Sequence, residues 1–164
     1  IVCLKHQDFK KFVLTGGHGG AYWVGAFIKH INYKFPDIIL IDAHAGGDKA
    51  WTAGLIAADL ESSSDVHGGE LSACLAAYLF DLSSAKIPAH GRKVDENWKE
   101  YWDYMTWDRF SKDGSMGILS ESKTVEELKE KGKVLLETYA KIQSKKLRSH
   151  FNKAVALKGI DLDS

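Results

Sequence analysis

The 164-residue sequence contains only two cysteines and two prolines, and it has no long hydrophobic stretch. Cys3 and Cys74 lie far apart in apolar segments, so we interpret them as reduced core residues of a cytoplasmic protein. No apolar run approaches the roughly 20 residues that a membrane-spanning helix needs. Excess charge is absent too, because 22 Lys and Arg balance 22 Asp and Glu. We therefore expect no disulfide framework, no membrane partner and no nucleic-acid partner.

The hydrophobic content of 45% and the charged content of 27% fit one globular domain over residues 1–164. Two short apolar runs, 12–15 and 37–42, are typical of buried strands. Apolar residues at helical spacing over 21–34 separate them, and this order predicts a right-handed βαβ unit. The sequence therefore indicates an α/β fold.

Further helices are expected downstream of this unit, over 49–59, 69–82 and 124–148. Thr124 and Glu127 have the spacing of a capping box, which predicts the start of the last helix. The last dozen residues are interpreted as a polar tail or an oligomer contact.

A glycine-rich loop, Gly16-Gly17-His18-Gly19-Gly20, follows the first strand directly. Ligands bind at the carboxyl ends of the strands of parallel sheets, and glycines let the backbone approach a ligand closely. We interpret His18 as a metal ligand, with Gly19 and Gly20 lining the substrate position. Two alternatives remain: a turn whose histidine bonds a neighbouring carbonyl, and a phosphate loop that lacks its usual Lys-Ser/Thr.

A second polar cluster, Asp65-Val66-His67-Gly68-Gly69-Glu70, opens a predicted helix. Imidazole and carboxylate groups suit zinc, manganese or iron. In the alternative interpretation Asp65 is a helix N-cap and Glu70 a first-turn charge. Residues His44 and Asp48 follow the second strand, but a loop histidine that bonds its own backbone is an equally good explanation there, so we exclude both from the metal ligands.

Tryptophans are concentrated around residues 95–111, with Trp51 further upstream. Trp51 and Trp102 are candidate walls of a substrate pocket. Core packing or a subunit interface is the competing explanation.

These motifs resemble, in order and spacing, those of the creatininase (creatinine amidohydrolase) family. The family's Gly-His-Gly-Gly-Asn loop is matched over residues 17–21, and its Asp-x-His-Ala-Gly-Glu segment over residues 65–70. Its Gly-x-x-Gly loop and Glu-Lys-Gly tract are echoed at 114–117 and 130–132. The resemblance implies a mostly parallel sheet sandwiched by helices, often assembled as a homohexamer.

The resemblance also implies roles for individual residues. His18 and Glu70 would each bind one of two divalent metals, while His67, with Asp65, would provide acid/base catalysis. Two cations lower the pKa of a shared water and polarise the scissile carbonyl, and an imidazole can pass a proton to the leaving atom. The expected activity is hydrolysis of a small cyclic amide.

The sequence departs from the family pattern at several positions. Ala21 replaces the usual asparagine, and 72–74 lack the common Glu-Thr-Ser. The family's early Glu-x-His and Asp ligands would lie upstream of Ile1. We therefore expect a fragment of a domain of about 250 residues, near the upper limit for one domain, or a partner chain that supplies those ligands.

The alternatives are a keto-inositol ring as substrate, a non-catalytic structural subunit of the same fold, and a nucleotide-binding module.

Overall fold

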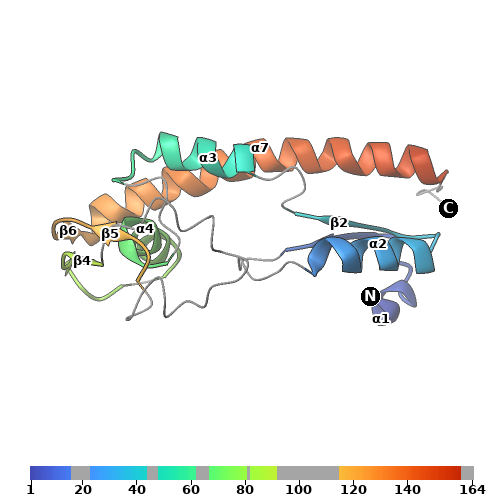
Figure 1. Ribbon diagram of the computed structural model, residues 1–164, viewed down its shortest axis with the longest axis horizontal. Helices are drawn as coiled ribbons and strands as arrows, with labels where there is room; N and C mark the ends of the chain where they lie inside the picture. The colour runs from blue at the N-terminus through green and yellow to red at the C-terminus, as the bar shows by residue number, and fades with distance from the viewer. Residues whose placement is uncertain (16–22, 44–47, 62–66, 81, 92–114, 160–164) are drawn as a thin grey trace. The chain divides into compact units, whose positions relative to one another are not determined.

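The computed structural model describes residues 1–15, 23–43, 48–61, 67–80, 82–91 and 115–159. Its elements are shown in Figure 1, coloured along the chain. Contacts divide the chain into two compact units. Unit 1 comprises residues 1–50 and 140–164, and unit 2 comprises residues 51–139. Each unit is described by itself, and the prediction of one domain over residues 1–164 stays a prediction.

Unit 1 is built on the predicted βαβ unit. After the short helix α1 (Val2–Lys5), strand β1 (Lys11–Leu14), helix α2 (Val24–Lys34) and strand β2 (Ile39–Asp42) follow in order. The two strands pair in parallel, from Lys11 opposite Ile39 to Leu14 opposite Asp42. Phe12, Ile31, Ile38 and Leu40 form the core between the sheet and α2. The predicted order of strand, helix and parallel strand is confirmed.

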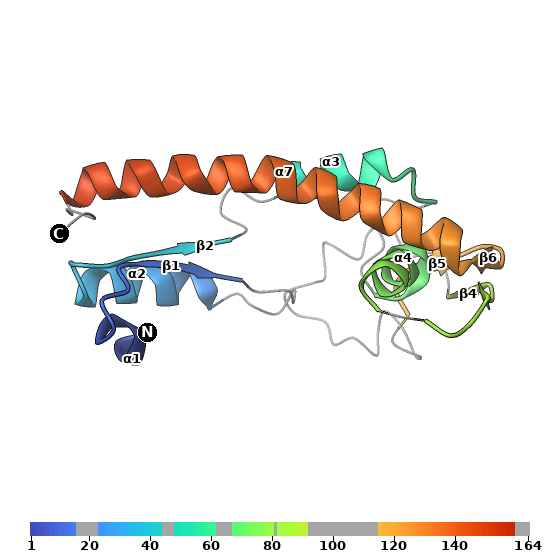
Figure 2. The ribbon, with the colours of Figure 1, turned by 180° about the vertical axis from the view of Figure 1, so that it is seen from behind.

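The second half of α7 (Val125–Lys158) belongs to unit 1 from residue 140 onward. It runs alongside β2, with the strand pair between it and α2 (Figure 2). The Lys158 ammonium binds the carbonyl oxygens of Ile38 at 2.7 Å and Asn32 at 2.9 Å. The Gln143 amide donates to the carbonyl of Ala43 at the other end of β2. Helical structure thus covers both faces of β2.

Unit 2 combines helices with two very short ladders. Its helices are α3 (Asp48–Ala57), which begins in unit 1, α4 (Gly69–Leu79) and the first half of α7. Strand β3 (Lys86–Ile87) pairs with β6 (Lys123–Thr124), and β4 (His90–Gly91) pairs with β5 (Ile118–Leu119), both antiparallel. One core cluster includes Cys74, Leu119 and Leu128, and a second includes Leu71 and Leu135.

The fold is therefore a mixture of helices and small sheets, which agrees with the α/β prediction in outline. Only β1 and β2 pair in parallel among the described residues. No helix in the described ranges is long and apolar enough to cross a membrane.

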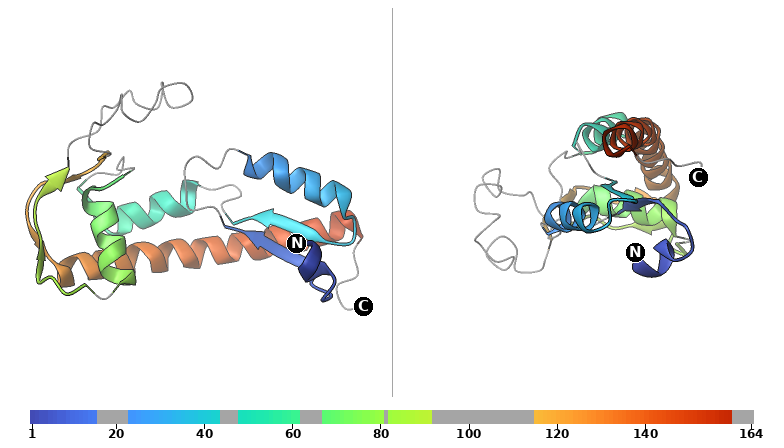
Figure 3. Two further views of the ribbon diagram at one scale, coloured as in Figure 1. Left: turned by 90° about the horizontal axis from the view of Figure 1, so that it is seen from below. Right: turned by 90° about the vertical axis from the view of Figure 1, so that its right-hand side faces the viewer.

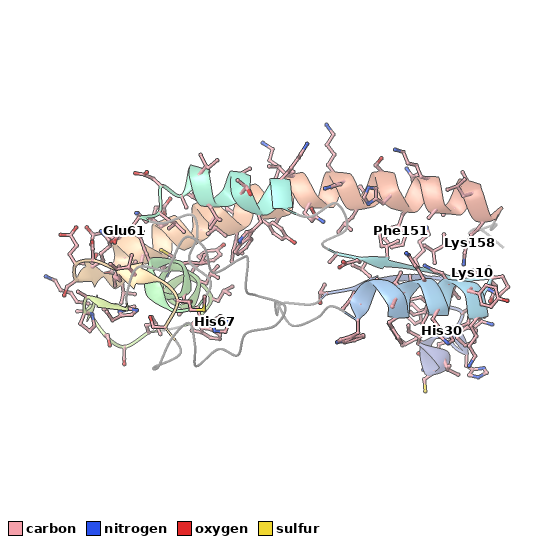
Figure 4. All side chains as sticks on the ribbon, in the orientation of Figure 1. Lys10, His30, Glu61, His67, Phe151 and Lys158 are labelled. Carbon is pink, nitrogen blue, oxygen red and sulfur yellow. The ribbon has the colours of Figure 1, made fainter. Side chains whose placement is uncertain are left out.

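The length of α7 differs from the prediction. It continues to Lys158 rather than ending near residue 148, so residues 153–158 of the predicted tail are helical. The extra turns are held on unit 1 because Phe151 and Val155 are half-buried and Lys158 binds backbone carbonyls (Figure 4).

Candidate functional site

The predicted site residues divide into those that the structure describes and those outside it. His18, Gly19, Gly20, Asp65 and Trp102 lie outside the described residues. His67, Glu70 and Trp51 lie within them, all in unit 2.

The carboxyl ends of β1 and β2 are held side by side. The backbone N–H of Ala43 donates to the carbonyl of Leu14 at 2.9 Å. Because the strands are parallel, Thr15 and Ala43, the last described residues before the glycine-rich segment and before residue 44, lie at the same end of the sheet. This is the end where α/β proteins bind ligands.

Two glycines turn the chain between His67 and Glu70. Gly68 is the N-cap of α4 with φ of 76°, and Gly69 has φ of 67°. Both values lie in the left-handed region that favours glycine. Since Gly68 occupies the cap, Asp65 is not the N-cap of this helix. The glycine pair therefore supplies the positive-φ backbone that the chain has directly before Glu70.

The backbone of His67 is fixed by Met116, 49 residues further along the chain. The two residues form an antiparallel bridge, in which Met116 N–H donates to the His67 carbonyl at 2.6 Å and His67 N–H donates in return at 3.4 Å. The Met116 side chain is buried, whereas the His67 residue is half-buried at the start of α4 (Figure 4). The segment 115–117 thus supports the candidate catalytic histidine.

Glu70 is fully buried, with 0% exposure. Its Oε1 accepts a hydrogen bond from Lys131 Nζ at 2.7 Å, and its Oε2 accepts one from the backbone N–H of Glu61 at 2.6 Å. Lys131 also donates to the carbonyl of Asp59 at 2.6 Å. The carboxylate therefore joins the connection after α3 to α4 and α7. As a metal ligand, the Glu70 carboxylate would interact with both the metal and the Lys131 ammonium.

Glu61 extends this network and was missed in the sequence. Its Oε2 accepts a hydrogen bond from the backbone N–H of Ser120 at 2.9 Å, and Lys123 lies 3.7 Å from its Oε1. Burial raises the pKa of Glu61, but the Ser120 hydrogen bonds and the Lys123 and Lys131 ammonium groups outweigh it, so that the pKa is lowered overall. These contacts thus favour the ionised form of the Glu61 carboxylate. No local motif marks Glu61, whereas Lys131 belongs to the Glu-Lys-Gly tract.

The close packing around Gly132 explains why the Glu-Lys-Gly tract has a glycine at this position. A Cβ atom added to it would overlap the carbonyl oxygen of Cys74 and come within 2.9 Å of Tyr78 Cβ. The first half of α7 therefore approaches α4 closely, which brings Lys131 within reach of Glu70.

Trp51 packs in unit 2. Its ring makes an edge-to-face contact with Tyr139, with centroids 5.6 Å apart, and it lies against the core cluster around Leu135. This geometry favours core packing over a pocket wall, and a substrate role for Trp51 stays a prediction.

Across the described part of the chain, no group of three or more His, Cys, Asp or Glu residues is placed to hold a metal ion. No known protein family, curated protein or solved structure matches the sequence.

Proposed function

We propose that the protein is a metal-dependent hydrolase of the creatininase type that acts on a small cyclic amide. The observation that supports it is a convergence within unit 2. Three tracts resemble the family, at 65–70, 114–117 and 130–132, and their described residues meet around the start of α4 through the His67–Met116 bridge and the Glu70–Lys131 pair. Residues separated by about 50 to 60 positions are thus neighbours in space, as a shared site requires.

Unit 1 supports the proposal independently. Its two strands pair in parallel, and α2 and the second half of α7 lie on opposite sides of the pair (Figure 2), which is in line with a parallel sheet between helices. The loop that carries His18 leaves the ligand-binding end of this pair. A complete sheet of the creatininase type would extend the same arrangement.

The donor types fit a divalent metal such as zinc, manganese or iron, because a neutral imidazole and a carboxylate are both suitable ligands. His18 and Glu70 would each bind one of two such metals, and the bound metals would supply a water of lowered pKa and polarise the amide carbonyl. Two protein ligands do not complete a site for two metals, so further ligands would come from additional chain. Lys131 would neutralise Glu70 and hold its orientation.

His67 would act on the proton. Its imidazole would accept the proton of the reacting water and deliver it to the leaving nitrogen. The Met116 bridge would fix the backbone from which the imidazole reaches the substrate, and Asp65 would assist from the same segment. Gly19, Gly20, Trp51 and Trp102 are the proposed substrate contacts. We place the protein in the cytoplasm as a homo-oligomer.

Metal analysis of the full-length gene product tests this function. About one to two equivalents of metal per subunit are expected, as a one- or two-metal site requires. His18→Ala should lose both metal and activity. His30→Ala is the matched control, because His30 is exposed on α2 (Figure 4) and should keep both. A His18→Ala protein that retains metal and activity would contradict the proposal.

One observation favours a second candidate, a non-catalytic subunit of the same fold. Glu70 already has protein partners for both oxygens, so its burial is compensated without a metal. This candidate predicts no bound metal.

For the catalytic candidate, Ala21 in place of asparagine makes a keto-inositol ring the second substrate to assay after cyclic amides.

A further inference from the structure

His67 and Glu70 are separated by two glycines. Gly68 and Gly69 both have positive φ, 76° and 67°. Glycine adopts a wider range of backbone conformations than any other residue. The glycine pair alone therefore does not hold the backbone of His67 at a fixed position relative to the Glu70 carboxylate. Contacts elsewhere in unit 2 have to do so.

The Glu70–Lys131 pair holds the connection after α3 at two points. Lys131 Nζ donates at 2.6 Å to the carbonyl of Asp59, whose φ of 49° is uncommon for a residue other than glycine. Glu70 Oε2 accepts a hydrogen bond from the Glu61 N–H at 2.6 Å. The cation of the pair thus binds a carbonyl, and its anion binds an N–H two residues further on. These contacts fix the backbone of Glu61 to the carboxylate of Glu70.

The side chain of Glu61 reaches the segment that supports His67. Glu61 Oε2 accepts a hydrogen bond from the Ser120 N–H at 2.9 Å, and the Glu61 side chain is 19% exposed. Ser120 directly follows β5, and Met116, which bridges His67, lies two residues before β5. β5 also lies beside α4 in unit 2 (Figure 3, left view). One short segment therefore connects the Glu61 carboxylate to the backbone of His67.

We propose that Glu61 is a positioning residue that holds the backbone of His67 in a fixed place relative to Glu70. Its N–H binds the Glu70 carboxylate and its own carboxylate binds Ser120, so one residue joins the supports on both sides of the glycine pair. In this role Glu61 acts through other residues and not on the substrate. Its effect on turnover rests on the proposed hydrolase function, whereas its effect on the backbone does not.

Hydrogen exchange on the full-length protein tests the backbone effect without a substrate. Glu61→Ala removes the acceptor of the Ser120 N–H, so the Ser120 and Met116 amides should exchange about tenfold faster, as for the loss of a hydrogen bond to a charged group. Glu61→Gln keeps an acceptor oxygen and should restore most of the protection. Glu121→Gln is the matched control, because the Glu121 side chain pairs with the same Lys123 but is 75% exposed. It should leave both amides protected.

Steady-state kinetics with creatinine as the cyclic amide test the effect on turnover. Glu61→Ala should lower kcat about tenfold or more and leave KM within about twofold, because the reacting groups are misaligned while the substrate contacts remain. The metal content should equal that of wild type, and Glu61→Gln should recover most of kcat. Circular dichroism at the assay temperature confirms that each variant is folded, so that kcat refers to folded enzyme.

The two measurements separate this inference from the proposed function. If wild type hydrolyses no cyclic amide, the proposed function fails and hydrogen exchange still decides the role of Glu61. Wild-type protection of the Met116 amide in Glu61→Ala would overturn the inference even in an active enzyme, and so would an unchanged kcat. Glu61→Asp, which withdraws the carboxylate by one methylene group, gives the same test if Glu61→Ala does not fold.

Discussion

The Lys131 ammonium lies 2.7 Å from the Glu70 carboxylate, which is fully buried. The next residue, Gly132, allows α7 to pass close to Cys74 on α4. Two neighbouring residues of one short tract therefore serve the same contact, one by charge and the other by lacking a side chain. This contact holds the start of α4, where the candidate site residues lie.

Lys131→Met tests the charge. The substitution leaves the Glu70 carboxylate buried without its cation, which should lower the free energy of unfolding by about 2 to 3 kcal/mol. This loss is smaller than for a fully buried ion pair because the Lys131 side chain is partly exposed. Chemical denaturation measures it. Lys129→Met, on the exposed side of the same helix, should change stability by less than about 0.5 kcal/mol. Equal stability of the two variants would show that the ion pair is dispensable.

Gly132→Ala tests the close approach. The added methyl group would overlap backbone atoms of α4, so the helices must separate, at a cost of about 1 to 3 kcal/mol. Gly25→Ala is the control, since no atom lies within 4 Å of its added methyl group. That change should stabilise α2 by about 0.5 kcal/mol. Thermal melting of both variants should therefore give shifts of opposite sign, and shifts of the same sign would refute the packing argument.

Features that depend on nearby residues could be predicted from the sequence. The βαβ unit follows from two apolar runs and the helical spacing between them. The capping box is confirmed, since Thr124 N–H donates to Glu127 Oε2 at 2.8 Å and Glu127 N–H donates to Thr124 Oγ1 at 3.2 Å. In each case the interactions that form the structure join residues close together in the sequence, so the local sequence pattern predicts it.

Features that depend on distant residues could not be predicted. Glu70 was expected to be a metal ligand, but its neighbours Lys131 and Glu61 are set by how α4 and α7 pack. The antiparallel two-residue ladders are too short to leave an alternating pattern. The last turns of α7 form because Lys158 reaches the carbonyls of unit 1, a contact over 120 positions that local composition does not reveal.

The capping box makes stability depend on pH. Hydrogen bonds from the Thr124 side chain and backbone hold the pKa of Glu127 below its usual value of 4.5. A lowered pKa stabilises the fold above about pH 4.5, and this contribution is lost as the pH falls through the lower folded-state value. Glu127→Gln should therefore be less stable than wild type at pH 7, and the difference should shrink toward pH 3. A difference that is independent of pH would contradict the role of the ionised carboxylate. Denaturation at several pH values measures it.

The two cysteines should differ in reactivity. Burial raises the pKa of the Cys74 thiol to about 12, with a further contribution from the Glu70 carboxylate. Cys3 is exposed, so the prediction that it is a core residue was wrong. At pH 8 only about one Cys74 thiol in 10,000 would be ionised. Native protein should therefore react with one equivalent of a thiol reagent, and unfolded protein with two. The Cys3→Ser variant should not react until it unfolds, and rapid native labelling of that variant would refute the burial of Cys74.

Asn32 should be the most sensitive polar residue of α2. Asn32→Ala leaves both the N–H and the carbonyl of Leu40 without their partners, at a cost of about 2 kcal/mol in the free energy of unfolding. Asn32→Asp keeps the acceptor but replaces the donor with a charge that faces a carbonyl, so it should not restore stability. Tyr33→Ala, at the exposed neighbouring position, controls for helix propensity. Hydrogen exchange adds a local readout, because the Leu40 amide should lose protection in Asn32→Ala and keep it in Tyr33→Ala. If that amide stays protected without the asparagine, another group closes the edge of β2.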